Sequence, residues 1–242
     1  MILPTVRASF GRSDALHLVD LLARRDPELR EAARARLEED GPDSLLDDPR
    51  VRNALLTDPD VKAPPSLVFY VLVRQALLEG GVDSASTADF VASVVIAFAR
   101  TERAYRISDD SDEEFHYLVD MIEQLRSAEE RRAFLLRAHL GNYALWLSGL
   151  FPDYIEHRKW RRGGPDLDYY EEMGRKGFQL AAGHRLADDH GLSTLFATAA
   201  DRFGLLRAAL NDVSDSLLFP NRYSPERLMR QVTSEARWRR LS

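Results

Sequence analysis

The chain has 242 residues, of which 45% are hydrophobic and 30% are charged, and it carries a formal net charge of -6. This length and composition are typical of a globular protein with a large buried core. The sequence contains no cysteine, which excludes disulfides, thiolate nucleophiles and cysteine-based zinc or iron-sulfur sites. The negative charge disfavours general binding to nucleic acids, because binding to phosphate backbones depends on clustered positive charge.

No segment of the sequence is apolar for long enough to cross a membrane. The longest apolar run covers residues 90–99, whereas a membrane-spanning helix needs about 20 apolar residues. Pro4 and Arg7 lie where the apolar part of a signal peptide would have to be, and no basic leader precedes them. We therefore expect a cytoplasmic protein without a membrane partner.

Signals for the start of a helix recur from one end of the chain to the other. Asp26 before Pro27 is typical of a helix N-cap followed by proline at the first helical position, and Ser224 before Pro225 repeats the pattern. Further pairs have the spacing of a capping box or of its aspartate variant, namely Ser111 with Glu114, Ser127 with Glu130, and Asp168 with Glu171. These signals predict a chain of successive helices.

The predicted elements, in chain order, are helices only. They cover residues 13–25, 27–39, 47–56, 66–79, 86–106, 112–126, 128–151, 153–162, 168–190, 193–218 and 225–240. The segment LVFYVLV at 67–73 has the composition of a strand, but it continues into RQALLE without a turn residue. We predict a buried helix there, because no other segment offers a partner strand. The expected fold is all-α, a compact bundle of about ten helices without a sheet.

We predict one helical domain spanning residues 1–242. Residues 1–60 are rich in charge and poor in large apolar groups, which indicates a peripheral helical layer. Residues 61–218 form the predicted core, and residues 219–242 form a basic C-terminal helix.

The C-terminal helix is the favoured element for docking to a partner. Its apolar residues are Leu228, Val232, Trp238 and Leu241. They are too sparse for a core helix and too numerous for an isolated one, which favours contact with another protein.

The helix predicted at 128–151 carries polar groups on a face that should be apolar. At about 100° per residue, its inward stripe consists of Leu135, His139, Tyr143, Trp146 and Leu150, with Asn142 and Gly149 at the edge. His139 is therefore expected inside the protein, where its ring nitrogens need hydrogen-bond partners.

The helix predicted at 168–190 has small and polar residues on one face. The aligned residues are Tyr170, Met173, Gly174, Gly177, Ala181, His184 and Asp188. A glycine inside a helix costs about 1 kcal/mol relative to alanine. Gly174 and Gly177 therefore indicate either a close helix crossing or a ligand pressed against the backbone.

In the helix predicted at 193–218, Arg207 and Ser214 flank the apolar stripe. A buried guanidinium needs a carboxylate partner, because an unpaired charge in the interior is very unfavourable. We predict that Asp188 is this partner.

The polar groups of these three helices have two main interpretations. The favoured one is a satisfied hydrogen-bond network that fixes the register of the helices. The other is a small-molecule pocket, because such pockets are mostly apolar with a few placed polar groups. The candidate ligand-binding residues of this pocket are His139, Asn142, Tyr143, Trp146, Tyr170, Gly174, Gly177, His184, Asp188 and Arg207.

A metal-dependent helical enzyme, similar to an oxidase or oxygenase, is the alternative function. His184, Asp188 and His139 are its candidate ligands, with Glu171 as an outer carboxylate. The spacing of His184 and Asp188 is similar to part of the ligand set of helical haem-oxygenase-like metal oxidases, over one helical turn.

Other motifs in the chain are weak. Glu113 with His116 is a single Glu-x-x-His pair, whereas a di-iron site needs two on facing helices. The sequence GRKG at 174–177 matches the loop by which KH domains hold nucleic acid, but it lies between helical patterns. Basic residues surround Trp160, a composition suited to phosphate contact with base stacking, but cations are also favoured at the C-terminal end of a helix. A nucleic-acid partner is therefore not favoured.

The sequence contains no phosphate-binding loop, dinucleotide fingerprint or nucleophile elbow. Catalytic residues and cofactors therefore stay unknown. The leading hypothesis is a non-catalytic helical binding or interaction module. Its expected partner is another protein or a second copy of the chain, with a small molecule as the further option.

Overall fold

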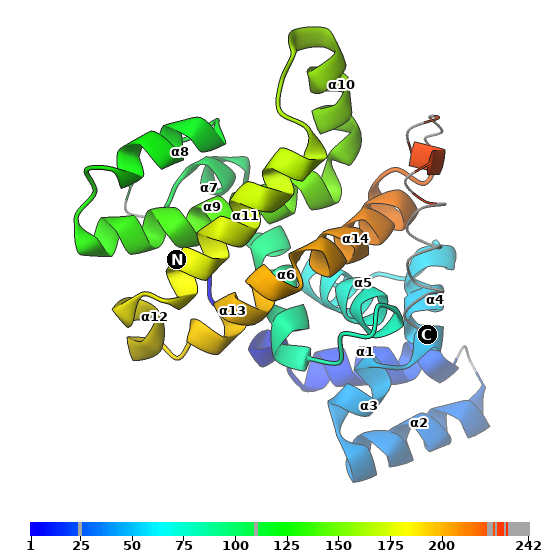
Figure 1. Cartoon of the computed structure of the whole chain (residues 1–242). Coiled ribbons are helices and arrows are strands. Elements are labelled where there is room, and N and C mark those ends of the chain that lie inside the picture. Colours follow the sequence, from blue (N-terminus) through cyan, green and yellow to red (C-terminus); the bar gives the residue numbers. More distant parts are fainter. Residues whose placement is uncertain (24–25, 109–110, 222–224, 226, 230, 232–242) are drawn as a thin grey trace. The chain divides into compact units, whose positions relative to one another are not determined.

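The computed structural model describes residues 1–23, 26–108, 111–221, 225, 227–229 and 231, apart from the side chain of Thr101. These residues form helices and contain no strand, so the predicted all-α fold is confirmed for the described part of the chain (Figure 1). None of the helices within these ranges is both long enough and apolar enough to pass through a bilayer.

The chain forms two compact units, which we describe separately. The first unit contains residues 4–93, and the second contains residues 1–3 and 94–242. The boundary falls inside helix α6 (Ala85–Phe98). The predicted single domain over residues 1–242, with its division into layer and core, stays a prediction.

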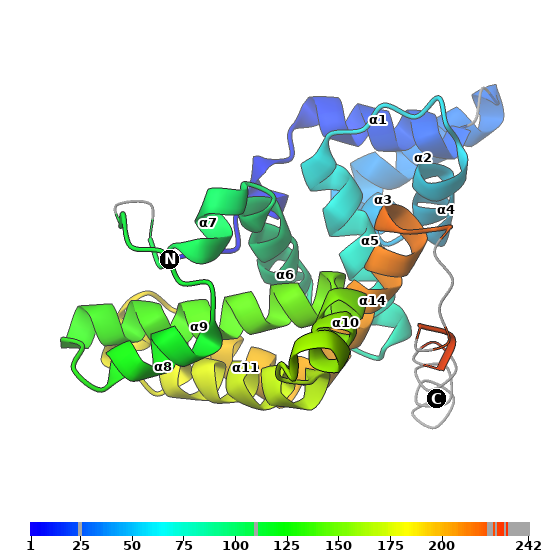
Figure 2. The same cartoon turned by 90° about the horizontal axis from the view of Figure 1, so that it is seen from above.

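The unit of residues 4–93 is built from short helices. Its elements before α6 are a 3-10 turn (Arg7–Ser9), α1 (Arg12–Ala23), α2 (Pro27–Asp40), α3 (Pro42–Leu46), α4 (Pro49–Thr57) and α5 (Pro65–Glu79). Helix α1 packs against α2, α3 and α4, and α4 also packs against α5 (Figure 2). Helices α2 to α5 each begin with a proline, whose fixed φ and missing N–H suit the first helical turn.

Local sequence explains two of these helices directly. The Asp26 side chain accepts hydrogen bonds from the amides of Glu28 and Leu29, so the predicted N-cap of α2 is confirmed. Helix α5 contains the strand-like segment 67–73, and residues 70–77 are all buried. The segment is helical, as predicted, and it lacks a polar face because protein covers most of its surface, with Val68 and Phe69 half-buried.

The second unit is built around helix α9 (Glu130–Leu150). The other elements are α7 (Thr101–Tyr105), α8 (Leu118–Leu125), α10 (Pro152–Arg162), α11 (Leu167–Ala182), α12 (Arg185–Asp189), α13 (Ser193–Asp201), α14 (Phe203–Val213) and a π-helical segment (Ser214–Leu218). Helix α9 packs against α8, α10, α11 and α14, and α11 also packs against α13. Figure 1 and Figure 2 both show α9 and α11 side by side. The core of this unit therefore lies along α9.

Two of the long predicted helices are interrupted. The helix predicted at 86–106 is divided into α6 and α7, with residues 99–100 between them. The helix predicted at 193–218 is divided at Arg202 into α13 and α14, and its last turn is π-helical. The apolar pattern continues on both sides of each break, so it does not reveal where a helix ends.

The helix predicted at 168–190 ends at Ala182, and the short helix α12 follows. His184 lies between the two helices, and its Nδ1 atom accepts a hydrogen bond from the Leu186 amide at 3.2 Å. This imidazole is therefore the N-cap of α12. His184 and Asp188 do not continue the inner face of α11, which corrects the predicted alignment.

The capping boxes predicted at Ser111, Ser127 and Asp168 do not form. Helix α11 begins after Asp166, whose carboxylate accepts a hydrogen bond from the Tyr169 amide. Helix α9 begins after Glu129, which makes no side-chain cap. The hydroxyl of Ser111 accepts a hydrogen bond from the Glu113 amide in a loop before α8. Capping-box spacing thus recurs in this charged sequence without marking helix starts.

Candidate ligand-binding site

The glycines of the predicted pocket lie at the crossing of α9 and α11. A Cβ atom on Gly177 would lie 2.8 Å from the backbone nitrogen of Gly141 and 2.9 Å from the carbonyl oxygen of Arg137. A Cβ atom on Gly174 would overlap the ring of Phe203. Both glycines therefore allow close contact between protein groups, the first of the two predicted explanations. Their role in ligand binding stays a prediction.

The predicted inward stripe of α9 forms an aromatic cluster. The rings of His139 and Trp146 both contact Phe98, with centroids 5.5 and 5.6 Å apart. Tyr143 lies beside both rings, and its hydroxyl donates a hydrogen bond to the carbonyl oxygen of His116 at 3.2 Å. His139 and Tyr143 are buried, as the helical periodicity predicts, and Trp146 is half-buried.

His139 and Asn142 are each 2% exposed. The Nε2 atom of His139 and the Oδ1 atom of Asn142 have no hydrogen-bond partner among the described residues. Burial lowers the pKa of His139 to about 3, and the charge of Arg103 acts in the same direction. The imidazole is therefore neutral at pH 7, and the predicted hydrogen-bond network is incomplete at this point.

His184 is also buried, but its neighbours differ from those of His139. Its ring stacks on Phe134 of α9, with centroids 5.1 Å apart. Tyr170, on the inner face of α11, is 5% exposed, and burial raises the pKa of its hydroxyl. The two imidazoles therefore point inward, as predicted, but they contact different aromatic groups.

Arg207 of α14 pairs with α11 rather than with α12. Its Nε atom lies 3.1 Å from Oε2 of Glu171. Asp188 is exposed and accepts a hydrogen bond from Ser193. The prediction that Asp188 is the partner of Arg207 is therefore wrong, because the end of α11 at Ala182 leaves Asp188 on a separate short helix.

Side chains from α14 and the π-helical segment bind the carbonyl groups that end α9. The Nδ2 atom of Asn211 donates hydrogen bonds to the carbonyl oxygens of Ser148 at 3.0 Å and Gly149 at 2.6 Å. The hydroxyl of Ser214 donates to the carbonyl oxygen of Leu150 at 2.7 Å. The last carbonyl groups of a helix have no partner within the helix, so these bonds cap α9 and fix its register against α14.

The described ranges contain no group of three or more His, Cys, Asp or Glu side chains that is placed to hold a metal ion. Glu113 pairs with Arg132 and Gln124, and His116 is exposed. The metal-dependent enzyme therefore stays a prediction, and no ligand cluster supports it in this part of the chain.

Most of the predicted docking helix lies outside the described residues. Leu228 is described and is 60% exposed. Val232, Trp238, Leu241 and the predicted N-cap Ser224 lie outside the described ranges. Docking through this helix stays a prediction.

The unit of residues 4–93 contains a cleft with a volume of about 520 Å³. Its walls come from the segment before α1, from α1, α2 and α3, and from single residues of α5 and α6. The apolar lining includes Phe10, Leu18, Leu37, Pro42, Leu46 and Leu67. The charged lining residues are Arg7, Arg12, Asp14, Asp43 and Asp89.

Asp89 of α6 holds one wall of the cleft. Its Oδ1 atom accepts a hydrogen bond from the Arg7 amide at 2.9 Å and lies 3.5 Å from the hydroxyl of Ser93, one turn further along α6. The Ser93 hydroxyl accepts a hydrogen bond from the Thr5 amide at 3.1 Å. Two side chains of α6 thus fix the backbone of residues 5–7.

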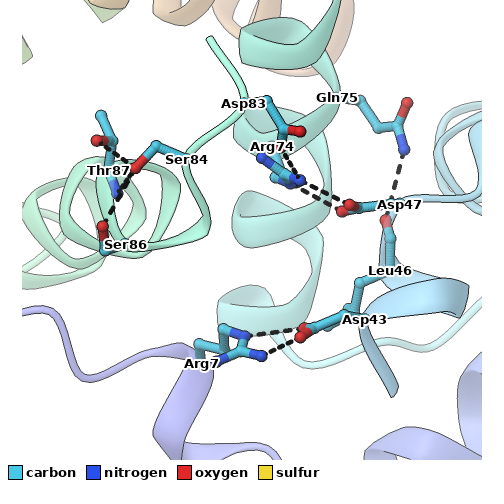
Figure 3. A network of polar contacts seen from close by, with 10 residues as sticks. All are labelled: Arg7, Asp43, Leu46, Asp47, Arg74, Gln75, Asp83, Ser84, Ser86 and Thr87. Atoms are coloured by element: carbon cyan, nitrogen blue, oxygen red, sulfur yellow. Dashed lines mark hydrogen bonds and ion pairs between the residues drawn. The ribbon is translucent and has the colours of Figure 1, made fainter. Parts of the chain in front are cut away.

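Helix α3, a second wall, is held from two sides (Figure 3). Arg7 binds both carboxylate oxygens of Asp43, with 2.9 Å between Nε and Oδ1. On the other side, the buried Arg74 binds both oxygens of Asp47 at 2.8 and 2.6 Å. The hydrogen bonds that Arg74 donates to Asp47 raise the pKa of Arg74, so this guanidinium stays charged. Paired guanidinium-carboxylate contacts have a defined geometry, and they fix α3 in place.

The cleft is not predictable from the sequence, because its lining has no motif. The lining residues are spread between residues 7 and 89, on several short elements. The high charge of the first 60 residues indicated only a peripheral layer. One signal was present, because Asp89 places a carboxylate directly before the apolar run of residues 90–99.

No protein-family model matches the chain, and neither a curated protein nor a solved structure matches it significantly. The function is therefore inferred from the geometry and chemistry of the chain itself. The crossing of α9 with α11 and α14 and the cleft of residues 4–93 are the two candidate regions.

Proposed function

We propose that the protein is a non-catalytic binding module and that the cleft of residues 4–93 holds a small, largely apolar molecule. The observation that carries this proposal is the cleft itself, with a volume of about 520 Å³ and a lining of apolar side chains with a few charged ones. Ligand sites in proteins commonly have this size and composition.

The fixed walls of the cleft support the proposal. Asp89 holds the backbone of Arg7, and the side chain of Arg7 holds Asp43 on α3. Phe10 packs edge-on against Tyr70 of α5, with ring centroids 5.4 Å apart. Because protein contacts already order these groups, a ligand that binds there pays a smaller cost in conformational entropy.

The crossing of α9 with α11 is better explained as packing. The ring of Phe178 occupies the space beside Gly141, and the ring of Phe203 occupies the space beside Gly174. Asn211 completes the end of α9 with hydrogen bonds to its carbonyl groups. We therefore place the proposed ligand in the cleft and assign a structural role to the crossing.

The proposal can be tested by filling the cleft. Ala15 of α1 lines the cleft and is half-buried, so Ala15→Trp places an indole there without replacing a core residue. Ala32→Trp, on the exposed surface of α2, is the matched control. The probes are 1-octanol, octylamine and octanoate, which share one alkyl chain and differ in their head groups. Binding to the full chain is measured by isothermal titration calorimetry.

We expect at least one probe to bind the wild-type chain and the Ala32→Trp variant with equal affinity. Ala15→Trp should weaken that binding by about tenfold or more, because the indole occupies the site. Circular dichroism should show the same helix content in all three proteins. If no probe binds the wild-type chain, or if Ala15→Trp leaves the binding of every probe unchanged, the proposed function is wrong.

A further inference from the structure

The lining of the cleft also indicates what kind of molecule it binds. Resting on the proposed function, we infer that the ligand combines an apolar body with a positively charged amine, and that Asp89 binds the amine. The inference depends on three features of Asp89: its burial, its unpaired oxygen and the state of the other charges around the cleft.

Asp89 is the most buried charged residue of the cleft, with 7% of its surface exposed. Its Oδ1 atom accepts hydrogen bonds from two neutral donors, the Arg7 amide and the Ser93 hydroxyl. Among the described residues, no donor reaches its Oδ2 atom and no basic side chain forms an ion pair with it. A buried carboxylate is unfavourable unless it is paired and hydrogen-bonded. The Oδ2 atom is not sealed off by protein atoms, so the cleft contains an acceptor that a ligand can reach.

The other charges of the cleft are already paired or exposed. The guanidinium of Arg7 and the carboxylate of Asp43 bind and neutralise each other. The Oδ2 atom of Asp14 accepts a hydrogen bond from the Gly11 amide at 2.9 Å. Arg12 is exposed to solvent. The charge of Arg7 acts on Asp89 as well as on Asp43, but the lining holds three aspartates against two arginines. The cleft therefore carries an excess of one negative charge, and it attracts a cation.

An ammonium group matches this acceptor. It supplies both the positive charge and the N–H donor that Oδ2 lacks, and a charge-assisted hydrogen bond is stronger than a neutral one. The apolar body of the same molecule would contact side chains that are not fully buried, such as Phe10, Leu37 and Pro42. A neutral alcohol supplies a donor without charge, whereas a carboxylate is repelled by Asp89. The three head groups of the probes therefore separate these alternatives.

The direct test is Asp89→Asn in the full chain. The asparagine keeps an oxygen that can accept from the Arg7 amide, so the wall of the cleft is retained while the charge is removed. Asp20→Asn is the matched control, because it removes the same charge from an exposed position on α1 outside the cleft. Binding of octylamine and 1-octanol is measured by calorimetry at fixed pH and ionic strength.

We expect the wild-type chain to bind octylamine about tenfold or more tightly than 1-octanol, and octanoate most weakly. Asp89→Asn should reduce the affinity for octylamine to the level of 1-octanol and leave 1-octanol unchanged. Asp20→Asn should bind all three probes as the wild type does. The order of the three probes on the wild-type chain decides the inference even if Asp89→Asn fails to fold.

Equal affinity of the wild type for octylamine and 1-octanol, or preference for octanoate, would overturn the inference about the amine. Sensitivity of that binding to Ala15→Trp would still support the proposed function. If Ala15→Trp does not weaken the binding of octylamine, the amine binds elsewhere on this negatively charged protein. That result would count against both the proposed function and the inference about the amine. The two proposals can therefore fail separately.

Discussion

The crossing of α9 with α11 and the cleft of residues 4–93 both place polar and small residues in the interior, but they surround them differently. At the crossing, Gly177 faces the backbone of Gly141, so protein atoms fill the space beside the glycine. In the cleft, hydrogen bonds and an ion pair hold the walls, and a volume of about 520 Å³ is left between them. One oxygen of Asp89 in that region has no donor among the described residues.

This difference has a physical cause in the length of the elements. Helix α9 has 21 residues and α11 has 16, so their side chains interlock over several turns. Helix α3 has 5 residues and is separated from α2 by Gly41 alone, and the segment before α1 is a single 3-10 turn. Elements this short are held by hydrogen bonds and ion pairs at their ends, and such contacts fix positions without filling the space between them.

The largest effect should come from a side chain added at the crossing. In Gly177→Ala, the new Cβ atom would lie 2.8 Å from the backbone nitrogen of Gly141, and backbone cannot move aside as a side chain can. We expect the free energy of unfolding to fall by about 3 kcal/mol or more. Urea unfolding followed by tryptophan fluorescence reports this region, because all three tryptophans lie at or after residue 146.

Gly183→Ala is the control for this prediction. A Cβ atom there would lie 3.8 Å from the carbonyl oxygen of Gln179, and the φ angle of -79° suits alanine. We expect a change within about 1 kcal/mol. Equal stability of the two variants would mean that the crossing has room beside its glycines, and the contrast between the two regions would be lost.

The second effect is a loss of stability in acid that originates at His139. Burial lowers its pKa from 6.5 in the unfolded chain to about 3 in the folded chain. The unfolded chain therefore binds a proton first, and the contribution to stability is complete above pH 6.5 and falls as the pH decreases toward 3. Between pH 7 and pH 4.5 the free energy of unfolding should fall by about 2 to 3 kcal/mol from this residue alone.

Urea unfolding of the wild type and of His139→Leu at several pH values measures this contribution, because the carboxylates titrate alike in both proteins. The wild type should lose more stability than the variant over this range. Parallel pH dependence in the two proteins would contradict a buried, neutral imidazole at position 139.

A smaller effect is expected where α14 completes the end of α9. Asn211→Ala leaves the carbonyl groups of Ser148 and Gly149 buried without their donor, and we expect a loss of about 1 to 3 kcal/mol in the free energy of unfolding. Ser216→Ala removes a hydroxyl whose solvent-exposed hydrogen bond goes to the carbonyl oxygen of Asp212, one turn earlier in α14, and it should change stability by about 0.5 kcal/mol or less. The same unfolding assay compares the two variants. Equal losses of stability would contradict a role of Asn211 in fixing the register of α9 against α14.

The smallest predicted effect is the coupling between Arg207 and Glu171. A double-mutant cycle with Arg207→Met and Glu171→Gln should give a coupling free energy of about 1 kcal/mol, because both groups are only partly exposed. The cycle with Asp188→Asn should give none, since Asp188 bonds to Ser193 instead. If Arg207 were coupled to Asp188 and not to Glu171, the result would support the continuous helix predicted at 168–190.

The helices and their inner faces could be predicted from the sequence because both follow from local periodicity. The buried position of His139 and the close approach at Gly177 depend on which side chains share a face. The helical state of residues 67–73 follows instead from their continuation into RQALLE without a turn residue and from the lack of a partner strand. The interruption at His184 could not be predicted in this way, because an imidazole that caps a helix looks in sequence like one on its inner face.

The cleft could not be predicted because it depends on contacts between distant residues. The Arg7 amide meets Asp89, and the Arg7 side chain meets Asp43, with no spacing rule that connects them. Pairing with Glu171 rather than Asp188 was missed for the same reason, since it depends on how α11 ends and how α14 packs. A carboxylate next to a long apolar run, as at Asp89, is a local signal for a buried charge with specific contacts.

The central claim is that ligand binds in the cleft and not at the helix crossing. Titration of the ¹⁵N-labelled full chain with octylamine, followed by amide chemical shifts, tests both regions in one experiment. We predict that the largest shifts occur at Arg7, in residues 10–18 and 43–46, and at Asp89, with little change in residues 139–146 and 170–177. Shifts concentrated in the latter two segments would contradict the account and would return the binding site to the crossing of α9 and α11.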